Sequence, residues 1–166
     1  MKKSWIISTI WGVSFLFHFV GVPLYFTSVL FHTEKMMSIY LIIFFVVSQF
    51  FTSFWNVFRY HHEYKLLPQI LKMIVALYVG IIAFAAYYRF EGVLAPNGVI
   101  SHEPLDALYF SIVTWTTLGY GDFQPSEVAR LWAGVQALMG TLFTPMLLAA
   151  IVFSADTRNT SYTIKE

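Results

Sequence analysis

The chain contains no cysteine and few charged residues. The absence of cysteine excludes a disulfide framework, a thiolate metal site and a cysteine nucleophile. Only 11% of the 166 residues are Asp, Glu, Lys or Arg, whereas about a quarter are charged in a typical soluble protein. The formal net charge of +1 is too small to suggest nucleic-acid binding. With 58% hydrophobic and 19% aromatic residues, the composition predicts a membrane protein.

Lysine and arginine are also absent from residues 4–31 and 37–58. A voltage-sensing helix needs several regularly spaced Arg or Lys residues within the membrane. These two stretches therefore exclude a voltage sensor of that kind and predict an accessory transmembrane hairpin, residues 1–65, that faces lipid. His18 lies within the first stretch, either as a functional group or as a side chain hydrogen-bonded to a neighbouring helix.

Four apolar stretches are long enough to cross a hydrocarbon core of about 30 Å, which takes about 20 helical residues. They cover residues 5–31, 37–58, 69–90 and 127–153. A further apolar run at 105–116 is too short to span, so it predicts a re-entrant half-helix buried within protein. The sequence therefore predicts an all-α membrane protein with four transmembrane helices and one re-entrant helix followed by a loop.

The positions of Lys and Arg predict the orientation of the chain. Cytoplasmic chain ends would place seven of these residues inside and three outside, in agreement with the positive-inside rule. The inner residues would be Lys2, Lys3, Arg59, Lys65, Lys72, Arg158 and Lys165, and the outer ones Lys35, Arg89 and Arg130. We therefore expect a multi-pass protein of the plasma membrane, or of the inner membrane in a bacterium, with both termini cytoplasmic.

The most informative stretch, residues 114–122, reads Thr-Trp-Thr-Thr-Leu-Gly-Tyr-Gly-Asp. Gly-Tyr-Gly-Asp alone is compatible with a turn between strands. Glycines at alternate positions also suit a backbone that alternates between left- and right-handed conformations, because glycine adopts positive φ without a steric penalty. Such a backbone directs successive carbonyl oxygens to one side, where they replace the water around a K⁺ ion.

This motif resembles the selectivity filter of the potassium channel family, and residues 69–153 resemble its two-helix pore unit. The resemblance implies K⁺ sites formed by the carbonyls of Thr117, Leu118, Gly119 and Tyr120, with the Thr117 hydroxyl as the lowest ring. Gly121 would complete the filter, and Asp122 would form a carboxylate ring at the outer mouth. Because one chain covers only one side of an ion, a chain with one filter implies a homotetramer, with three identical subunits as partners.

The resemblance also assigns residues that brace the filter from behind. They are Tyr109, Val113 and Thr116. Tyr109 and Phe110 stand where some family members have two tryptophans, and Val113 stands where some have a buried Glu. The Tyr109 hydroxyl is expected to reach Asp122, whereas Phe110 has no donor for Tyr120. We expect Tyr120 to pack behind the filter.

The last apolar stretch would form the pore-lining inner helix. Its candidate cavity and gate residues are Gly140, Thr141, Thr144, Pro145 and Leu148. Gly140 is either a hinge or a point of close helix packing. Pro145 is expected to bend the helix near the gate.

The cytoplasmic link at residues 59–65 contains cations, histidines and aromatic residues. Arg59 and Lys65 are candidates to bind anionic lipid headgroups. His61 and His62 suit a sensor of internal pH. A solvated loop with an aromatic belt explains the segment equally well.

These features divide the chain into three parts: the accessory hairpin (1–65), a pore domain (66–154) and a short cytoplasmic tail (155–166). The expected function is passive, potassium-selective ion conduction without enzymatic activity and without a cofactor other than permeant K⁺. Two alternatives remain: a weakly selective cation channel, and a non-conducting membrane subunit that regulates another channel.

Overall fold

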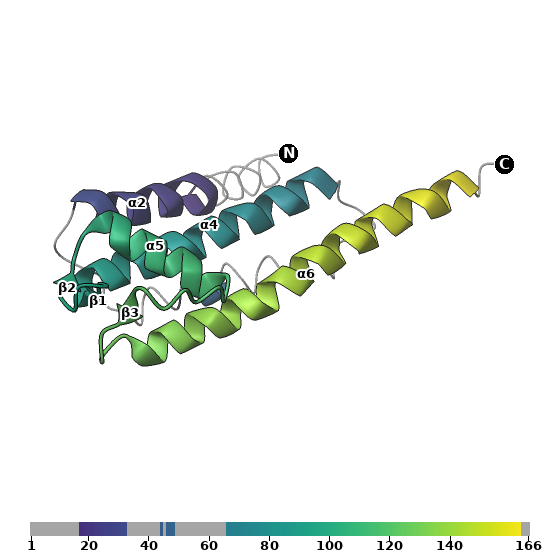
Figure 1. Ribbon diagram of the computed structural model, residues 1–166. Helices are drawn as coiled ribbons and strands as arrows, with labels where there is room; N and C mark the ends of the chain where they lie inside the picture. The colour runs from purple at the N-terminus through teal and green to yellow at the C-terminus, as the bar shows by residue number, and fades with distance from the viewer. Residues whose placement is uncertain (1–16, 33–43, 45, 49–65, 164–166) are drawn as a thin grey trace, which may run out of the picture.

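The computed structural model describes residues 17–32, 44, 46–48 and 66–163. Most of these residues are helical, as predicted (Figure 1). The helices are a π-helical turn η1 (Phe17–Gly21), α2 (Val22–His32), α4 (Leu66–Glu91), α5 (Pro104–Trp115) and α6 (Arg130–Thr163). The predicted second span, residues 37–58, lies largely outside the described residues. The link at 59–65, which contains Arg59 and Lys65, lies entirely outside them.

Two of the described helices are long and apolar enough to cross a membrane. The spans cover Ile70–Glu91 in α4 and Arg130–Ala149 in α6. Both correspond to predicted spans. The described part of the predicted first span consists of η1 and α2, and the change from π-helix to α-helix falls at Gly21 and Val22.

The short helix α5 packs against both long helices, and Figure 1 shows it beside α4 with α6 on its other side. It begins at Pro104, a residue suited to the first helical turn, and Asp106 in that turn interacts favourably with the positive end of the helix dipole. The rings of Tyr88 and Phe110 meet edge to face at 4.8 Å between centroids. Ala107, between them and the outer loops, is fully buried. Apolar packing against α4 thus keeps a helix too short to span inside the protein.

The end of α5 is held by one tryptophan. Trp115 is 4% exposed, and its ring meets Phe143 of α6 edge to face at 5.9 Å between centroids. An added Cβ at Gly80 of α4 would lie 2.5 Å from the indole ring. An added Cβ at Gly140 of α6 would overlap the backbone carbonyl of Trp115. Glycine at both positions therefore permits a close approach of three helices.

The accessory helix α2 packs on α4 of its own chain. The hydroxyls of Thr27 and Tyr78 share a hydrogen bond of 2.7 Å. In the last turn of α4, the Arg89 guanidinium donates to the backbone carbonyls of Val29 and Leu30, near the end of α2. These carbonyls have no partners within the helix, and a cation there also complements the helix dipole.

A small antiparallel sheet corrects the all-α prediction. Its strands are β1 (Val93–Leu94), β2 (Ile100–Ser101) and β3 (Gln124–Pro125), in the order β2-β1-β3. Val93 pairs with Ser101 and with Pro125, so the sheet joins the loop after α4 to the segment after the Thr117–Asp122 motif. Strands of two residues are too short to show an alternating hydrophobic pattern, which is why the sequence did not reveal them.

Helix α6 also differs from its predicted bounds of 127–153. It begins at Arg130 and continues to Thr163, so most of the predicted tail extends the inner helix. Pro145 lies inside this helix without ending it. Proline removes one backbone donor, and the helical hydrogen bonds on either side keep the helix continuous.

Two glycines of α6 provide a matched test of the packing around Trp115. Gly140→Ala is expected to destabilise the protein by about 1–3 kcal/mol, because the methyl group overlaps the Trp115 carbonyl. Gly134→Ala is the control: nothing lies within 4 Å of an added Cβ there, so alanine is expected to be neutral or to stabilise the helix by up to about 1 kcal/mol. Thermal unfolding of the two variants in detergent measures the difference, and equal stability would favour the hinge interpretation of Gly140.

Candidate functional site

The backbone of the Thr117–Asp122 motif alternates in conformation. Thr117, Gly119 and Gly121 have φ values of 55°, 54° and 81°, and these are the left-handed positions of the motif. The alternation expected for Gly119 and Gly121 is therefore present, and it extends one step further to Thr117. A β-branched residue at positive φ is a steric outlier, and such strain is typical of functional sites.

The motif begins directly from the last turn of α5. The N–H groups of Thr117 and Leu118 donate to the carbonyls of Thr114 (3.1 Å) and Val113 (3.0 Å). The Thr116 hydroxyl donates to the Ile112 carbonyl at 2.8 Å. Val113, which the sequence assigned to bracing, thus contacts the start of the motif, whereas the side chain of Thr116, also assigned to bracing, bonds α5 itself. The contact of Val113 is made by its backbone carbonyl, so the hydrogen bond to Leu118 does not depend on the side chain at position 113.

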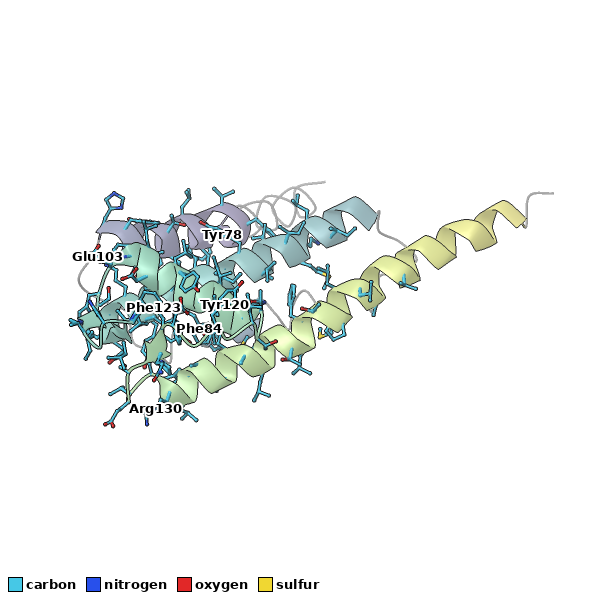
Figure 2. All side chains as sticks on the ribbon, viewed as in Figure 1. Tyr78, Phe84, Glu103, Tyr120, Phe123 and Arg130 are labelled. Atoms are coloured by element: carbon cyan, nitrogen blue, oxygen red, sulfur yellow. The ribbon has the colours of Figure 1, made fainter. Side chains whose placement is uncertain are left out.

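The central residues of the motif are exposed in a single chain. Leu118 is 55% exposed and Tyr120 is 67% exposed, and an added Cβ at Gly119 or Gly121 would meet nothing within 4 Å. Figure 2 marks Tyr120 in this loop, after α5. The expected packing of Tyr120 behind the motif is therefore not made within one chain, because the chain leaves most of the ring uncovered.

At the outer end, the Tyr109 hydroxyl donates to the Asp122 carboxylate at 2.8 Å, as the sequence led us to expect. The Tyr109 ring also meets Phe123 edge to face, with centroids 5.5 Å apart. A hollow of about 330 Å³ separates the turn at 95–98 from residues 121–124. Asp122 lines this hollow, so its carboxylate is bonded to Tyr109 of α5 and is still accessible to solvent.

The candidate cavity residues lie along α6. Thr141, Thr144, Pro145 and Leu148 are exposed in a single chain. The hydroxyls of Thr141 and Thr144 donate to the carbonyls four residues earlier, Ala137 at 2.9 Å and Gly140 at 3.3 Å. Gly140, unlike these exposed residues, is buried against Trp115, which supports the packing interpretation of this glycine.

Sequence reasoning missed a polar network inside the helix bundle. We call it the Gln136 network: the side chains of Tyr88, Ser111 and Gln136 with the backbone carbonyl of Ile81. Gln136 and Ser111 are completely buried. The sequence contains one indication of this network, because Gln136 is the only amide side chain in residues 127–153. The sequence does not show which helix that side chain faces.

Oxygen atoms dominate the possible ion ligands of the site. Within the described residues, no three His, Cys, Asp or Glu side chains lie close enough together to hold a metal ion. The motif instead offers backbone carbonyls, the Thr117 hydroxyl and the Asp122 carboxylate. Such oxygens suit a hard, weakly held cation.

Known proteins match the part of the chain that contains the Thr117–Asp122 motif. Residues 73–153 match the family model described as ion channel. Two-pore potassium channel 5 of Arabidopsis thaliana is 42% identical over 57 residues, which cover 34% of this chain and 14% of that protein. Two pore potassium channel b of Oryza sativa subsp. japonica is 40% identical over 81 residues, which cover 45% of this chain and 22% of that protein.

A potassium voltage-gated channel, subfamily A member 10 of Gallus gallus, is 29% identical over 82 residues, which cover 49% of this chain and 16% of that protein. The chain thus spans between 14% and 22% of the length of these relatives. No solved structure matches the chain. Residues 73–153, which run from α4 across α5 and the Thr117–Asp122 motif into α6, therefore match an ion channel family, and the relatives that they resemble are potassium channels.

Proposed function

We propose that the protein conducts K⁺ passively and selectively across a membrane. The observation that carries the proposal is the alternating backbone of the motif, with positive φ at Thr117, Gly119 and Gly121. This alternation directs the carbonyls of residues 117–120 to one side, as an oxygen cage for dehydrated K⁺ requires. The family relationship indicates a channel rather than an enzyme, with K⁺ as the permeant ion and no cofactor.

We further propose that four chains surround one pore. One chain supplies carbonyls to only one side of an ion, and its Tyr120 ring is left exposed. Large apolar side chains also remain exposed along α6, where Leu131, Leu138 and Leu142 are 59–70% exposed. Neighbouring subunits would cover the ring and part of this surface. Both termini would be cytoplasmic, with the outer sheet and Asp122 outside.

A weakly selective cation channel is the second candidate. Phe110, which replaces a possible donor to Tyr120, packs on Tyr88 instead. Within one chain, the side-chain hydrogen bond that would hold the outer half of the filter is the one from Tyr109 to Asp122. A filter that relaxes there would lose selectivity while continuing to conduct.

Reconstituted protein tests the proposal directly. In liposomes with opposed K⁺ and Na⁺ gradients, currents are expected to reverse near the K⁺ equilibrium potential. Gly119→Ala is expected to abolish selective current, because alanine at a φ of 54° costs about 1–2 kcal/mol per subunit. Phe26→Leu, a conservative change in the buried side of α2, serves as the control. Reversal near zero would favour the weakly selective channel, and no wild-type current would contradict both candidates.

Tyr109→Phe tests the outer hydrogen bond. Loss of a single hydrogen bond of about 0.5–1.5 kcal/mol is expected to speed the decay of K⁺ current during sustained opening, by up to about tenfold. Tyr78→Phe is the matched control, since its hydroxyl bonds Thr27 at the α2–α4 contact. Equal decay rates in the two variants would show that the Asp122 contact does not stabilise the conducting filter.

The assembly state is open to a separate measurement. Native mass spectrometry of the protein released from detergent is expected to show four chains. Leu138→Glu, which places a charge on the exposed face of α6, is expected to reduce the tetramer, whereas Ile70→Glu on α4 would test membrane insertion alone. A monomer or dimer as the largest wild-type species would contradict the tetramer.

A further inference from the structure

The Gln136 network joins all three helices of the pore unit. The Tyr88 hydroxyl of α4 donates to Gln136 Oε1 of α6 at 2.7 Å. Gln136 Nε2 donates to Ser111 of α5, at 2.7 Å to its hydroxyl and 3.1 Å to its carbonyl. The Ser111 hydroxyl then donates to the Ile81 carbonyl of α4 at 2.7 Å. The network thus starts and ends on α4 and passes through both other helices.

Every side-chain donor of this network has an acceptor. Both N–H groups of Gln136 are directed at Ser111, and the two hydroxyls donate to Gln136 and Ile81. Tyr88, Ser111 and Gln136 are each 0% exposed. A buried network with all of its groups paired fixes the relative positions of its members, whereas an apolar contact tolerates sliding. The network therefore sets how α5 sits against α6.

A second contact holds the same two helices at the level of Trp115. Gly140 and Phe143 of α6 contact this residue, and they follow Gln136 by four and seven positions on one face of the helix. Immediately beyond Trp115, the N–H groups of Thr117 and Leu118 bond the last turn of α5. A displacement of α5 relative to α6 is thus transmitted through backbone hydrogen bonds to the first residues of the filter.

We infer that Gln136 is a positioning residue for ion selection: it holds the pore helix α5 against the inner helix α6 and thereby sets the carbonyl geometry at Thr117 and Leu118. The inference rests on the proposed function of this site as a K⁺ filter. Gln136 touches no permeating ion, since its amide is buried among the three helices, and it acts through Ser111 and the last turn of α5.

Three variants test this role. Gln136→Met keeps the length of the side chain and removes its hydrogen bonds. The triple variant Tyr88→Phe/Ser111→Ala/Gln136→Met removes the whole network and leaves none of its side chains with an unpaired polar group. Phe26→Leu in α2 is the control, because it removes buried apolar surface without touching the network. For each variant we would measure the K⁺/Na⁺ permeability ratio in liposomes, thermal stability, and amide hydrogen exchange of residues 113–121.

A positioning role predicts that Gln136→Met and the triple variant both lower the permeability ratio by about tenfold, which corresponds to about 1.4 kcal/mol of discrimination. Exchange at Thr117 and Leu118 should be faster in both, even where the triple variant regains thermal stability. Phe26→Leu should keep the wild-type ratio and exchange. If Gln136→Met fails to assemble, the triple variant carries the test.

A wild-type ratio and wild-type exchange in the triple variant would overturn the inference and leave the network a purely stabilising one. So would a ratio that follows thermal stability across all three variants. If the wild-type protein carries no K⁺ current, the proposed function fails, and hydrogen exchange still decides the positioning role: faster exchange in the variants supports it, and unchanged exchange overturns it.

Discussion

The structure depends on one constraint: backbone polar groups at membrane depth must have partners inside the protein. Helix α5 is too short to span a bilayer, and the motif that follows it is not helical, so both must be enclosed by other helices. The packing of α5 against α4 and α6 satisfies this requirement for α5. It also explains why small residues occur at the closest contacts, with Gly80 and Gly140 on either side of Trp115. The Thr117–Asp122 motif is in turn attached to the end of α5 by the backbone hydrogen bonds of Thr117 and Leu118.

Apolar contacts bring the helices close together, whereas polar contacts restrict their relative positions. The apolar contacts of Phe110 and Trp115 bring α5 close to its neighbours, but similar side chains would pack nearly as well after a small rotation or slide. Gln136 and Ser111 permit far fewer positions, because a buried donor that loses its acceptor costs about 1–3 kcal/mol. Apolar packing thus brings the helices together, and a few buried hydrogen bonds restrict how α5 lies against α4 and α6.

The sequence predicted those features that follow from residue chemistry at short range. Gly119 and Gly121 signalled positive φ because glycine alone adopts it freely, and the pore helix was placed within one residue at each end. Positive φ at Thr117 was not visible, since a β-branched residue disfavours it and only its surroundings impose it. The Gln136 network and the three short strands were missed for a related reason. Both depend on which segments face each other, and neither a single amide nor a two-residue strand carries a periodic signal.

The small sheet has a consequence for motion within the Thr117–Asp122 motif. Strand β1 directly follows α4, and its pairing with β3 attaches the far end of the motif to α4, while α5 attaches the near end. The loop therefore has both ends fixed on one scaffold. Lengthening or shortening it would break backbone hydrogen bonds at one end or the other. Rotating single peptide planes at Gly119 and Gly121 breaks none of these bonds, so reorientation of individual carbonyls is the motion that costs least.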